Sequence, residues 1–162
     1  MPESPLPPRA VPDHDDGYFE ALTREVFGAG LSDAVVEQRW PAFRRAFADF
    51  SIERVAGFGA HDLARLLQDA GIVRNGRKIE ATFANARAWR EIVAEHGSAR
   101  AWLATTAHLP WPERKRTVSQ PFRGFGPSGA RTFLWRVGEN VPPREIEATW
   151  TDAVPEGWPE RA

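Results

Sequence analysis

One short stretch combines glycines, a proline and a helix start in a way that suits the binding of a phosphate group. It reads Arg123-Gly124-Phe125-Gly126-Pro127-Ser128-Gly129-Ala130. Gly124 and Gly126 can adopt the positive φ angles of a tight turn and leave the backbone open to close approach. Pro127 suits the first turn of a helix, where its missing N–H costs no hydrogen bond. The free N–H groups of such a helix start attract a phosphate. The alternative is a plain helix start after a glycine turn.

A glutamate on the apolar side of a helix is the second feature that bears on chemistry. Steps of four, three and four residues place these side chains on one face: Tyr18, Leu22, Glu25 and Ala29. Burial of a carboxylate is unfavourable unless the group is paired or hydrogen-bonded. Glu25 is therefore either a functional carboxylate or a residue at the edge of the core. In the second case it forms a salt bridge with Arg24 or with a more distant arginine.

A second loop could also hold a phosphate. Residues 69–79 join two predicted helices and contain three cations close to the start of the second helix, namely Arg74, Arg77 and Lys78. Positive charge at a helix N-terminus opposes the helix dipole, so these cations favour an anionic ligand there. Backbone N–H groups at the same helix start could bind a second phosphate. The alternative is an ordinary solvated helix start.

Composition narrows the class of protein. The chain has 162 residues and a formal net charge of −1, so any nucleic-acid surface must be a local basic patch. It contains no cysteine, which excludes disulfides and thiolate metal sites. Four histidines are scattered without ligand spacing, and we expect no metal and no cofactor. No segment approaches the roughly 18 apolar residues of a membrane span. The N-terminal segment lacks the features of a signal peptide, so we expect a cytoplasmic protein.

The spacing of apolar residues predicts an all-α chain with seven to nine helices and no sheet. We expect a flexible, proline-rich lead-in over 1–12, one helical domain over 13–140 and a tail over 141–162 that contains Trp150 and Trp158. Ser32 and Ser51 are expected to cap helices, and Pro41 to interrupt the helix that follows Ser32 within a few turns or to start a third helix. Residues 109–120 are predicted to form a loop. The predicted helices cover 18–29, the segment after 32, 51–57, 60–70, 75–97, 98–106 and 127–137.

Several segments taken together resemble the DNA-3-methyladenine glycosylase I family. They keep one order along the chain from about 11 to 138: Val11-Pro12, His14-Asp15-Asp16, Ala29-Gly30-Leu31-Ser32 after Glu25, residues 68–75, Arg77-Lys78-Ile79, Asn85-Ala86-Arg87-Ala88, Arg123-Gly124-Phe125 and Gly126-Pro127-Ser128. The resemblance implies a single all-α helix-hairpin-helix domain. It also implies an enzyme that flips an alkylated adenine out of duplex DNA and hydrolyses its N-glycosidic bond.

The resemblance also implies roles for individual residues. Glu25 matches the glutamate that hydrogen-bonds the adenine in the base pocket and is the candidate catalytic residue. Gly30 and Leu31 match the segment that enters the DNA beside the lesion, with Leu31 as the apolar wedge. The hairpin matches the phosphate anchor of the family. The expected DNA-binding residues are Arg74, Arg77, Lys78, Arg123, Gly124, Gly126, Ser128, Gly129 and Arg131.

The chain departs from the family in its metal ligands and its pocket aromatics. Family members bind zinc through a Cys and a His near the start and a His and a Cys near the end, whereas this chain has no cysteine. A pocket tryptophan of the family is replaced by Asp33. Tyr18, Phe27 or a C-terminal tryptophan could instead supply the aromatic wall of the pocket.

Three functions are consistent with the sequence. The first is a monomeric base-excision repair enzyme that acts on double-stranded DNA containing an alkylated, 3-methyladenine-like base. The second is a non-catalytic helix-hairpin-helix DNA-binding protein derived from such an enzyme. The third is a helical scaffold for protein interactions. Release of free base distinguishes the first from the second, and salt-dependent DNA binding distinguishes both from the third.

Overall fold

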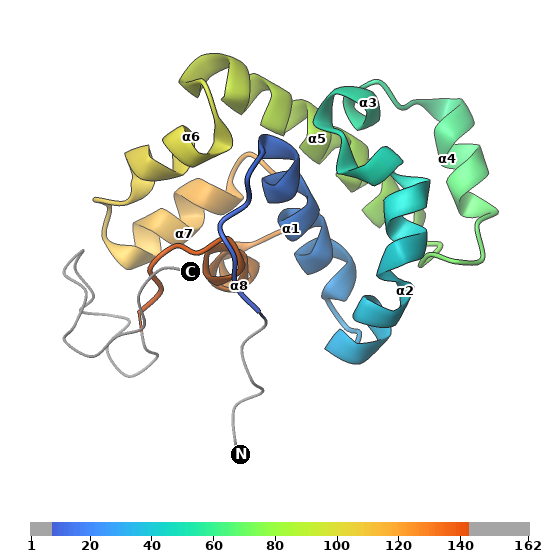
Figure 1. The fold of residues 1–162 in the computed structure, drawn as a ribbon, viewed down its shortest axis with the longest axis horizontal. Helices are drawn as coiled ribbons and strands as arrows, with labels where there is room; N and C mark the ends of the chain where they lie inside the picture. The colour runs from blue at the N-terminus through green and yellow to red at the C-terminus, as the bar shows by residue number, and fades with distance from the viewer. Residues whose placement is uncertain (1–7, 143–162) are drawn as a thin grey trace.

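Residues 8–142 are described in the computed structural model, and within them helices follow one another through short turns (Figure 1). The elements are α1 (Asp15–Gly28), α2 (Asp33–Ala46), the short 3₁₀ turn η1 (Ala48–Phe50), α3 (Ile52–Ala56), α4 (Ala60–Leu67), α5 (Gly76–His96), α6 (Ala99–Thr106), α7 (Trp111–Ser119) and α8 (Pro127–Arg136). This part of the chain contains eight α-helices and no strand, which confirms the predicted all-α class.

Polar side chains cap the helices where the sequence predicts helix starts. In four helices the residue before the first turn accepts a hydrogen bond from a backbone N–H three residues later: Ser32 in α2, Ser51 in α3, Asn75 in α5 and Ser98 in α6. Each cap satisfies one of the N–H groups that lack a partner within the helix, and typically contributes about 1 kcal/mol to stability. The helix boundaries are therefore encoded locally.

Pro41 does not interrupt α2, contrary to the expectation from its ring chemistry. The helix continues from Asp33 to Ala46 with the proline inside it. The flanking aromatic residues Trp40 and Phe43 are both buried, and their rings stack with centroids 5.0 Å apart. Burial of two large aromatic side chains contributes more than the hydrogen bond that proline removes, so packing overrides the local preference.

The segment predicted as a loop contains a helix. α7 runs from Trp111 to Ser119, with Pro112 in its first turn, where proline is compatible with a helix. Trp111, Arg114 and Val118 are buried at spacings of three and four residues. In this segment, Pro112 thus indicates a helix start, and Trp111 indicates the buried face of that helix.

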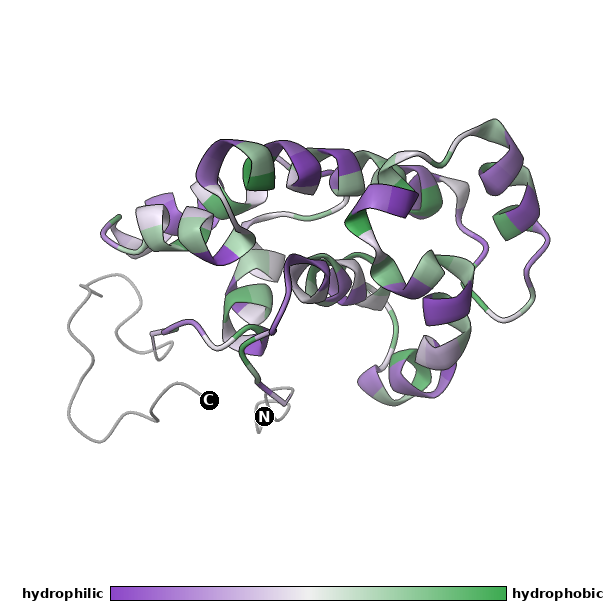
Figure 2. Cartoon of the chain, turned by 45° about the horizontal axis from the view of Figure 1, so that its top comes forward, coloured by the Kyte–Doolittle hydropathy of each residue, from purple (hydrophilic) through white to green (hydrophobic). Residues whose placement is uncertain are grey.

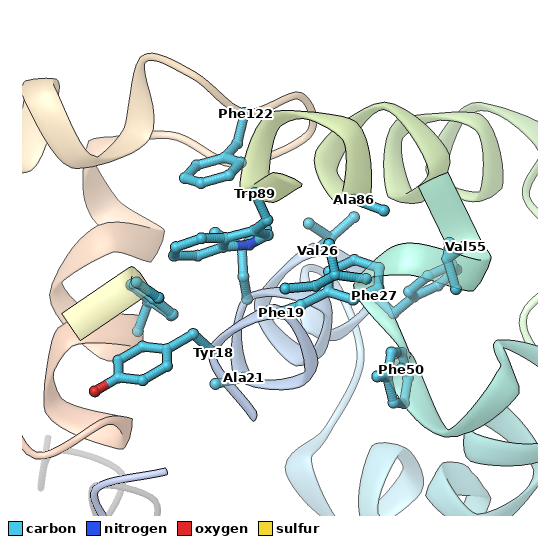
Figure 3. Close-up of a cluster of buried hydrophobic side chains, with 14 of the residues drawn as sticks. Tyr18, Phe19, Ala21, Val26, Phe27, Phe50, Val55, Ala86, Trp89 and Phe122 are labelled. Atoms are coloured by element: carbon cyan, nitrogen blue, oxygen red, sulfur yellow. The ribbon is translucent and has the colours of Figure 1, made fainter. Parts of the chain in front are cut away.

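α1 and α5 lie between two groups of helices, with α2, α3 and α4 on one side and α6, α7 and α8 on the other (Figure 1). Aromatic side chains fill the contact between α1 and α5. Trp89 of α5 is fully buried between Phe122 and Tyr18, with ring centroids 4.8 and 6.3 Å away (Figure 3). This packing fixes α1 against the middle of α5.

A second aromatic cluster surrounds a strained turn. The three residues of η1, Ala48, Asp49 and Phe50, all have φ between 53° and 56°, in the left-handed region. That region costs a residue other than glycine roughly 1–2 kcal/mol. Phe50 is fully buried and stacks on Trp40 and Phe47, with centroids 5.1 and 5.8 Å away. Aromatic burial offsets the strain.

Residues 8–12 pack against the end of α8, which corrects the expectation of a flexible lead-in for this part of it. The Ala10 N–H donates to the Arg136 carbonyl over 3.1 Å. Gly138 has φ of +84°, and a Cβ there would lie 2.7 Å from Val11. Val141 and Pro142, placed in the predicted tail, are buried as well. Residues 1–7 and the tail tryptophans lie outside the described residues.

Hydrophilic and hydrophobic residues share the same helices across the molecule (Figure 2). None of the helices within residues 8–142 combines the length and the apolar character that a membrane span requires.

A buried ion pair joins α7 to the chain after α8. Arg114 Nη2 lies 3.3 Å from Glu139 Oε1, and only 5% and 11% of these side chains is exposed. The Arg114 guanidinium also donates to Thr106 Oγ1 of α6 over 3.1 Å. The pair therefore connects three segments on one side of the molecule.

Replacement of Arg114 by Met should lower the free energy of unfolding by about 3 kcal/mol, because Glu139 loses this partner in a buried environment. Urea unfolding followed by tryptophan fluorescence measures the change. The double variant Arg114→Met with Glu139→Leu removes both charges and should recover most of the loss. Equal stability of Arg114→Met and the wild type would contradict the prediction.

Candidate nucleic-acid interface

The glycine-rich stretch forms a turn between α7 and α8, as predicted. Gly124 has φ of +67°, and a Cβ there would lie 3.3 Å from Val26 Cγ1 of α1. Gly126 does not have the positive φ expected from the sequence. Its φ of −118° is extended backbone that any residue can adopt. It is the residue before the first turn of α8, and a Cβ there would meet nothing within 4 Å. Of these two positions, only position 124 therefore needs glycine for its backbone conformation.

A buried asparagine holds this turn in place from α5. The Asn85 side-chain amide donates to the Arg123 carbonyl over 3.0 Å, and its Oδ1 accepts the Arg123 N–H over 2.7 Å. Only 1% of Asn85 is exposed. The two bonds reproduce the pairing of one peptide group with another, so they fix both the position and the orientation of the turn.

The first turn of α8 is open for the close approach of a ligand. The first hydrogen bond within the helix runs from the Ala130 N–H to the Gly126 carbonyl, and the Ser128 and Gly129 N–H groups precede it. Ser128 is exposed. Gly129 packs on the Phe125 ring, which a Cβ would approach to 3.1 Å. The lack of a side chain at Gly129 therefore makes room for the Phe125 ring and also leaves the first turn of α8 accessible to a ligand.

The turn between α1 and α2 carries an exposed apolar side chain. Gly30 has φ of +83°, and Leu31 beside it is 38% exposed. Lys78 of α5 donates from Nζ to the Ala29 carbonyl over 3.1 Å. Lys78, predicted as a phosphate-binding cation, thus also holds the turn that presents Leu31.

Both turns are attached to one side of α5. Lys78 and Asn85 are seven residues apart, which corresponds to two helical turns and roughly 10 Å along the axis. A Cβ at Gly124 would lie 3.3 Å from Val26 Cγ1, so the end of α1 lies close to the second turn as well. The predicted wedge and the predicted phosphate anchor are therefore held on a common rigid helix.

The other predicted DNA-binding cations differ in their surroundings. Arg74, Arg77 and Arg123 are exposed. Arg131 Nη1 instead donates to the Pro142 carbonyl over 2.7 Å, which turns it toward the chain after α8. The structure thus leaves the first three side chains at the surface and engages Arg131 within the fold.

Glu25 is paired with a distant arginine, which is the simpler of the two interpretations of its position. Its Oε1 lies 3.1 Å from Arg136 Nε, and the two side chains are 14% and 17% exposed. Burial raises the pKa of the Glu25 carboxyl, and the pKa stays raised although the charge and the hydrogen bond of Arg136 lower it. The nearby Asp33 carboxylate raises the pKa further. Glu25 is therefore a carboxyl group shielded from water, and its surroundings favour the protonated form.

The residues proposed to form an aromatic pocket wall lie elsewhere. Phe27 is fully buried against Phe43 and Phe47, with ring centroids 4.8 and 6.0 Å away, so no face of its ring is open to a base. Tyr18 is 3% exposed and packs on Trp89 (Figure 3). Both belong to the core, which corrects the expectation. Asp33 is exposed in the first turn of α2.

A charged groove lies next to the Glu25–Arg136 pair. It has a volume of about 310 Å³ between the segment 8–12, α1, α2 and the end of α8. Arg136 lines this groove, whereas Glu25 is not among its lining residues. Its other charged side chains are Arg9, Glu20, Arg24, Glu37 and Arg44. A second hollow, of about 430 Å³ along α7, contains none of the predicted site residues.

Sequence reasoning missed Arg136 and the role of Asn85. Arg136 follows the buried residues Ala130 and Phe133 at steps of three, so it lies at the edge of the buried face of α8. Asn85 precedes the buried Ala86 within the apolar stripe of α5. A charge or an amide on such a face requires a partner, and this was the available signal.

The donor set does not fit the zinc site that the resemblance implies. The chain has no cysteine. Among residues 8–142, no three histidine, aspartate or glutamate side chains gather closely enough to hold a metal ion. No step of the chemistry is therefore assigned to zinc.

Comparison with known proteins gives consistent matches. The chain is 39% identical over 83 residues to DNA-3-methyladenine glycosylase 1 of Escherichia coli (strain K12), covering 51% of this chain and 44% of that protein. It is 34% identical over 86 residues to DNA-3-methyladenine glycosylase of Haemophilus influenzae, covering 52% and 46%. The chain thus spans less than half the length of these curated relatives.

Solved structures share the fold. The 3-methyladenine DNA glycosylase I of Staphylococcus aureus superimposes with a TM-score of 0.72 at 24% identity, covering 79% of this chain and 78% of that one. Another 3-methyladenine DNA glycosylase I structure gives a TM-score of 0.67 at 26% identity, covering 79% and 81%. The model of the methyladenine glycosylase family matches residues 10–123. Since this match covers more than half of the sequence, the chain belongs to the methyladenine glycosylase family.

Proposed function

We propose that the chain is a DNA glycosylase that flips an alkylated base out of duplex DNA and hydrolyses its N-glycosidic bond. The observation that carries this proposal is the end of α1. There a shielded carboxylate, Glu25, is followed six residues later by the exposed Leu31. Removal of a base from the stack needs an apolar group to fill the gap and a recognition group for the extruded base. The last turn of α1 and the turn that follows it present both kinds of group.

Family membership supports the same function. The curated relatives are named as DNA-3-methyladenine glycosylases. One solved neighbour with a TM-score of 0.73, a variant at 24% identity, is described in complex with 3-methyladenine. The chain matches less than half of each curated relative, so their activity is carried over here as part of the proposal.

Backbone groups are proposed to bind the DNA. The N–H groups of Ser128 and Gly129 would bind a phosphate at the start of α8, with Arg123 beside them. Arg74 and Arg77 would contact a second phosphate near the start of α5. Such contacts orient the duplex without reading its sequence. Asn85 and Lys78 fix the two turns relative to each other, so the duplex would meet a rigid surface.

The proposed chemistry needs little help from acids and bases. A 3-alkylated adenine carries a positive charge, which weakens its glycosidic bond before the enzyme acts. A carboxylate in a shielded site stabilises a cationic base more than the same group in water, because screening is weaker. Extrusion of the base and the Glu25 carboxylate would then provide the remaining acceleration.

One observation favours a second candidate function. Arg136 already neutralises Glu25, which reduces what the carboxylate can offer to a cationic base. This favours a DNA-binding protein of the same fold without glycosylase activity. Chromatography of the bases that the purified protein releases from methylated duplex DNA decides between the two, since only the enzyme releases free base.

Replacement of Glu25 by Gln should lower the rate of base release by tenfold or more while duplex affinity stays nearly unchanged. The substitution keeps size and hydrogen-bonding capacity but removes the charge, and a tenfold loss corresponds to about 1.4 kcal/mol. Single-turnover release from methylated duplex DNA measures the effect. Equal rates for Glu25→Gln and the wild type would remove Glu25 from the proposed mechanism.

The same variant should not be less stable than the wild type at pH 7. The raised pKa means that the folded chain holds the Glu25 proton more tightly than the unfolded chain. Stability from this group is therefore fully present below the ordinary glutamate pKa, and is lost as the pH rises through the raised value. Glu25→Gln should abolish that decline, which urea unfolding across this pH window measures. A large loss of stability at pH 7 would contradict the prediction.

Replacement of Gly126 by Val should weaken duplex binding about tenfold for all sequences alike. A Cβ at this position meets no protein atom within 4 Å, so we expect the new side chain to obstruct a ligand that approaches the start of α8. Gly59 provides a matched control, because it precedes α4 and also has open space around it. Fluorescence anisotropy with a labelled duplex measures affinity. Equal affinity of Gly126→Val and Gly59→Val would contradict a phosphate contact at the hairpin.

A further inference from the structure

The Glu25–Arg136 pair connects the end of α1 to the last turn of α8. The Nε–Oε1 distance is 3.1 Å, and both side chains are more than four-fifths buried. The partners are 111 residues apart in the sequence, so the fold brings the charges together. Such a pair in a shielded place sets the local charge that any ligand of Glu25 experiences.

The arginine and not the glutamate faces the neighbouring groove. Arg136 lines the groove of about 310 Å³, while Glu25 is not among its lining residues. A ligand in this groove therefore meets the guanidinium at the groove wall, and the carboxylate is one hydrogen bond away from that guanidinium. The two opposite charges lie within one hydrogen bond of each other, so their effects on a bound charge largely cancel.

This arrangement changes what the site can distinguish. A lone carboxylate attracts a cationic alkylated base and gives an uncharged base only a hydrogen bond. With Arg136 in place, the cationic base loses most of that advantage, because the guanidinium charge offsets the carboxylate charge. Binding of the uncharged base is strengthened, because a guanidinium donates hydrogen bonds to acceptor atoms on a base edge.

We propose that Arg136 is a specificity-determining residue that lowers the preference of the site for cationic alkylated bases and brings uncharged damaged bases with a hydrogen-bond acceptor into its range. The proposal rests on the proposed glycosylase function. Glu25 would accept a hydrogen bond from an amino or ring N–H of such a base, and Arg136 would donate to its carbonyl or ring nitrogen. Hypoxanthine has both kinds of group on one edge.

The test compares release of a cationic and an uncharged base. Methylated duplex DNA supplies the cationic substrates 3-methyladenine and 7-methylguanine, and a duplex with a single hypoxanthine supplies the uncharged one. Initial rates are measured by chromatography at pH 8 for every variant. The measured quantity is the ratio of cationic to uncharged release, compared between variant and wild type so that intrinsic bond strengths cancel.

Arg136→Met keeps the aliphatic length and removes the charge. It should raise this ratio tenfold or more relative to the wild type. Arg136→Lys retains the charge and should stay within about threefold of the wild-type ratio. Arg45→Met is the matched control, because it removes one exposed positive charge from α2 outside the groove and should leave the ratio unchanged. If Arg136→Met fails to fold by circular dichroism, Arg136→Gln provides the uncharged variant.

Each outcome decides the question. A ratio that is unchanged in Arg136→Met while bases are still released would overturn the inference and leave the proposed function intact. An equal increase in both rates would show that Arg136 only obstructs the site, and would overturn the inference too. Absence of any base release by the wild-type protein would overturn the proposed function, and the inference with it.

Discussion

The paired hydrogen bonds between Asn85 and the backbone of Arg123 are the constraint on which the candidate interface depends. A turn that contains glycine with a positive φ has many conformations in solution, and a phosphate site requires one of them. The buried amide selects that conformation by satisfying both the N–H and the carbonyl of Arg123. Two helical turns away, Lys78 holds the turn before Leu31 through one hydrogen bond, which it donates to the Ala29 carbonyl. α5 is thus both a core helix and the support of the DNA-facing turns.

The core provides the stiffness that this support needs. Trp89 lies on α5 between Phe122, just before the hairpin, and Tyr18 of α1 (Figure 3). A displacement of α5 would disturb the packing on both sides, because interiors are close-packed and tolerate small volume changes poorly. Tyr18 therefore contributes to the geometry of the site from within the core, although its ring does not line a pocket. An aromatic residue near a site can position it without contacting the ligand.

Local signals in the sequence predicted the all-α class and most of the helices, but they did not predict which distant side chains pair. The caps at Ser32 and Ser51, the stripe of α5 and the turn at Gly124 follow from residue chemistry within a few positions. Pro41 and α7 were interpreted incorrectly, because the burial of Trp40, Phe43 and Trp111 outweighs what proline favours locally. The Glu25–Arg136 and Asn85–Arg123 contacts join residues 111 and 38 positions apart. Amphipathic patterns mark such residues as needing partners but do not identify the partners.

Burial has two opposing effects on the Glu25 carboxyl. A carboxylate that contacts a cationic base gains strength from burial, because screening by water is reduced, yet the same burial raises its pKa and favours the uncharged form. The adjacent Arg136 opposes this effect, since its charge stabilises the carboxylate, although the pKa stays raised. It does so by supplying the counter-charge that a cationic base would otherwise supply. Within this geometry, ionisation of Glu25 and a strong electrostatic preference for cationic bases are therefore competing properties, and Arg136 sets the balance between them.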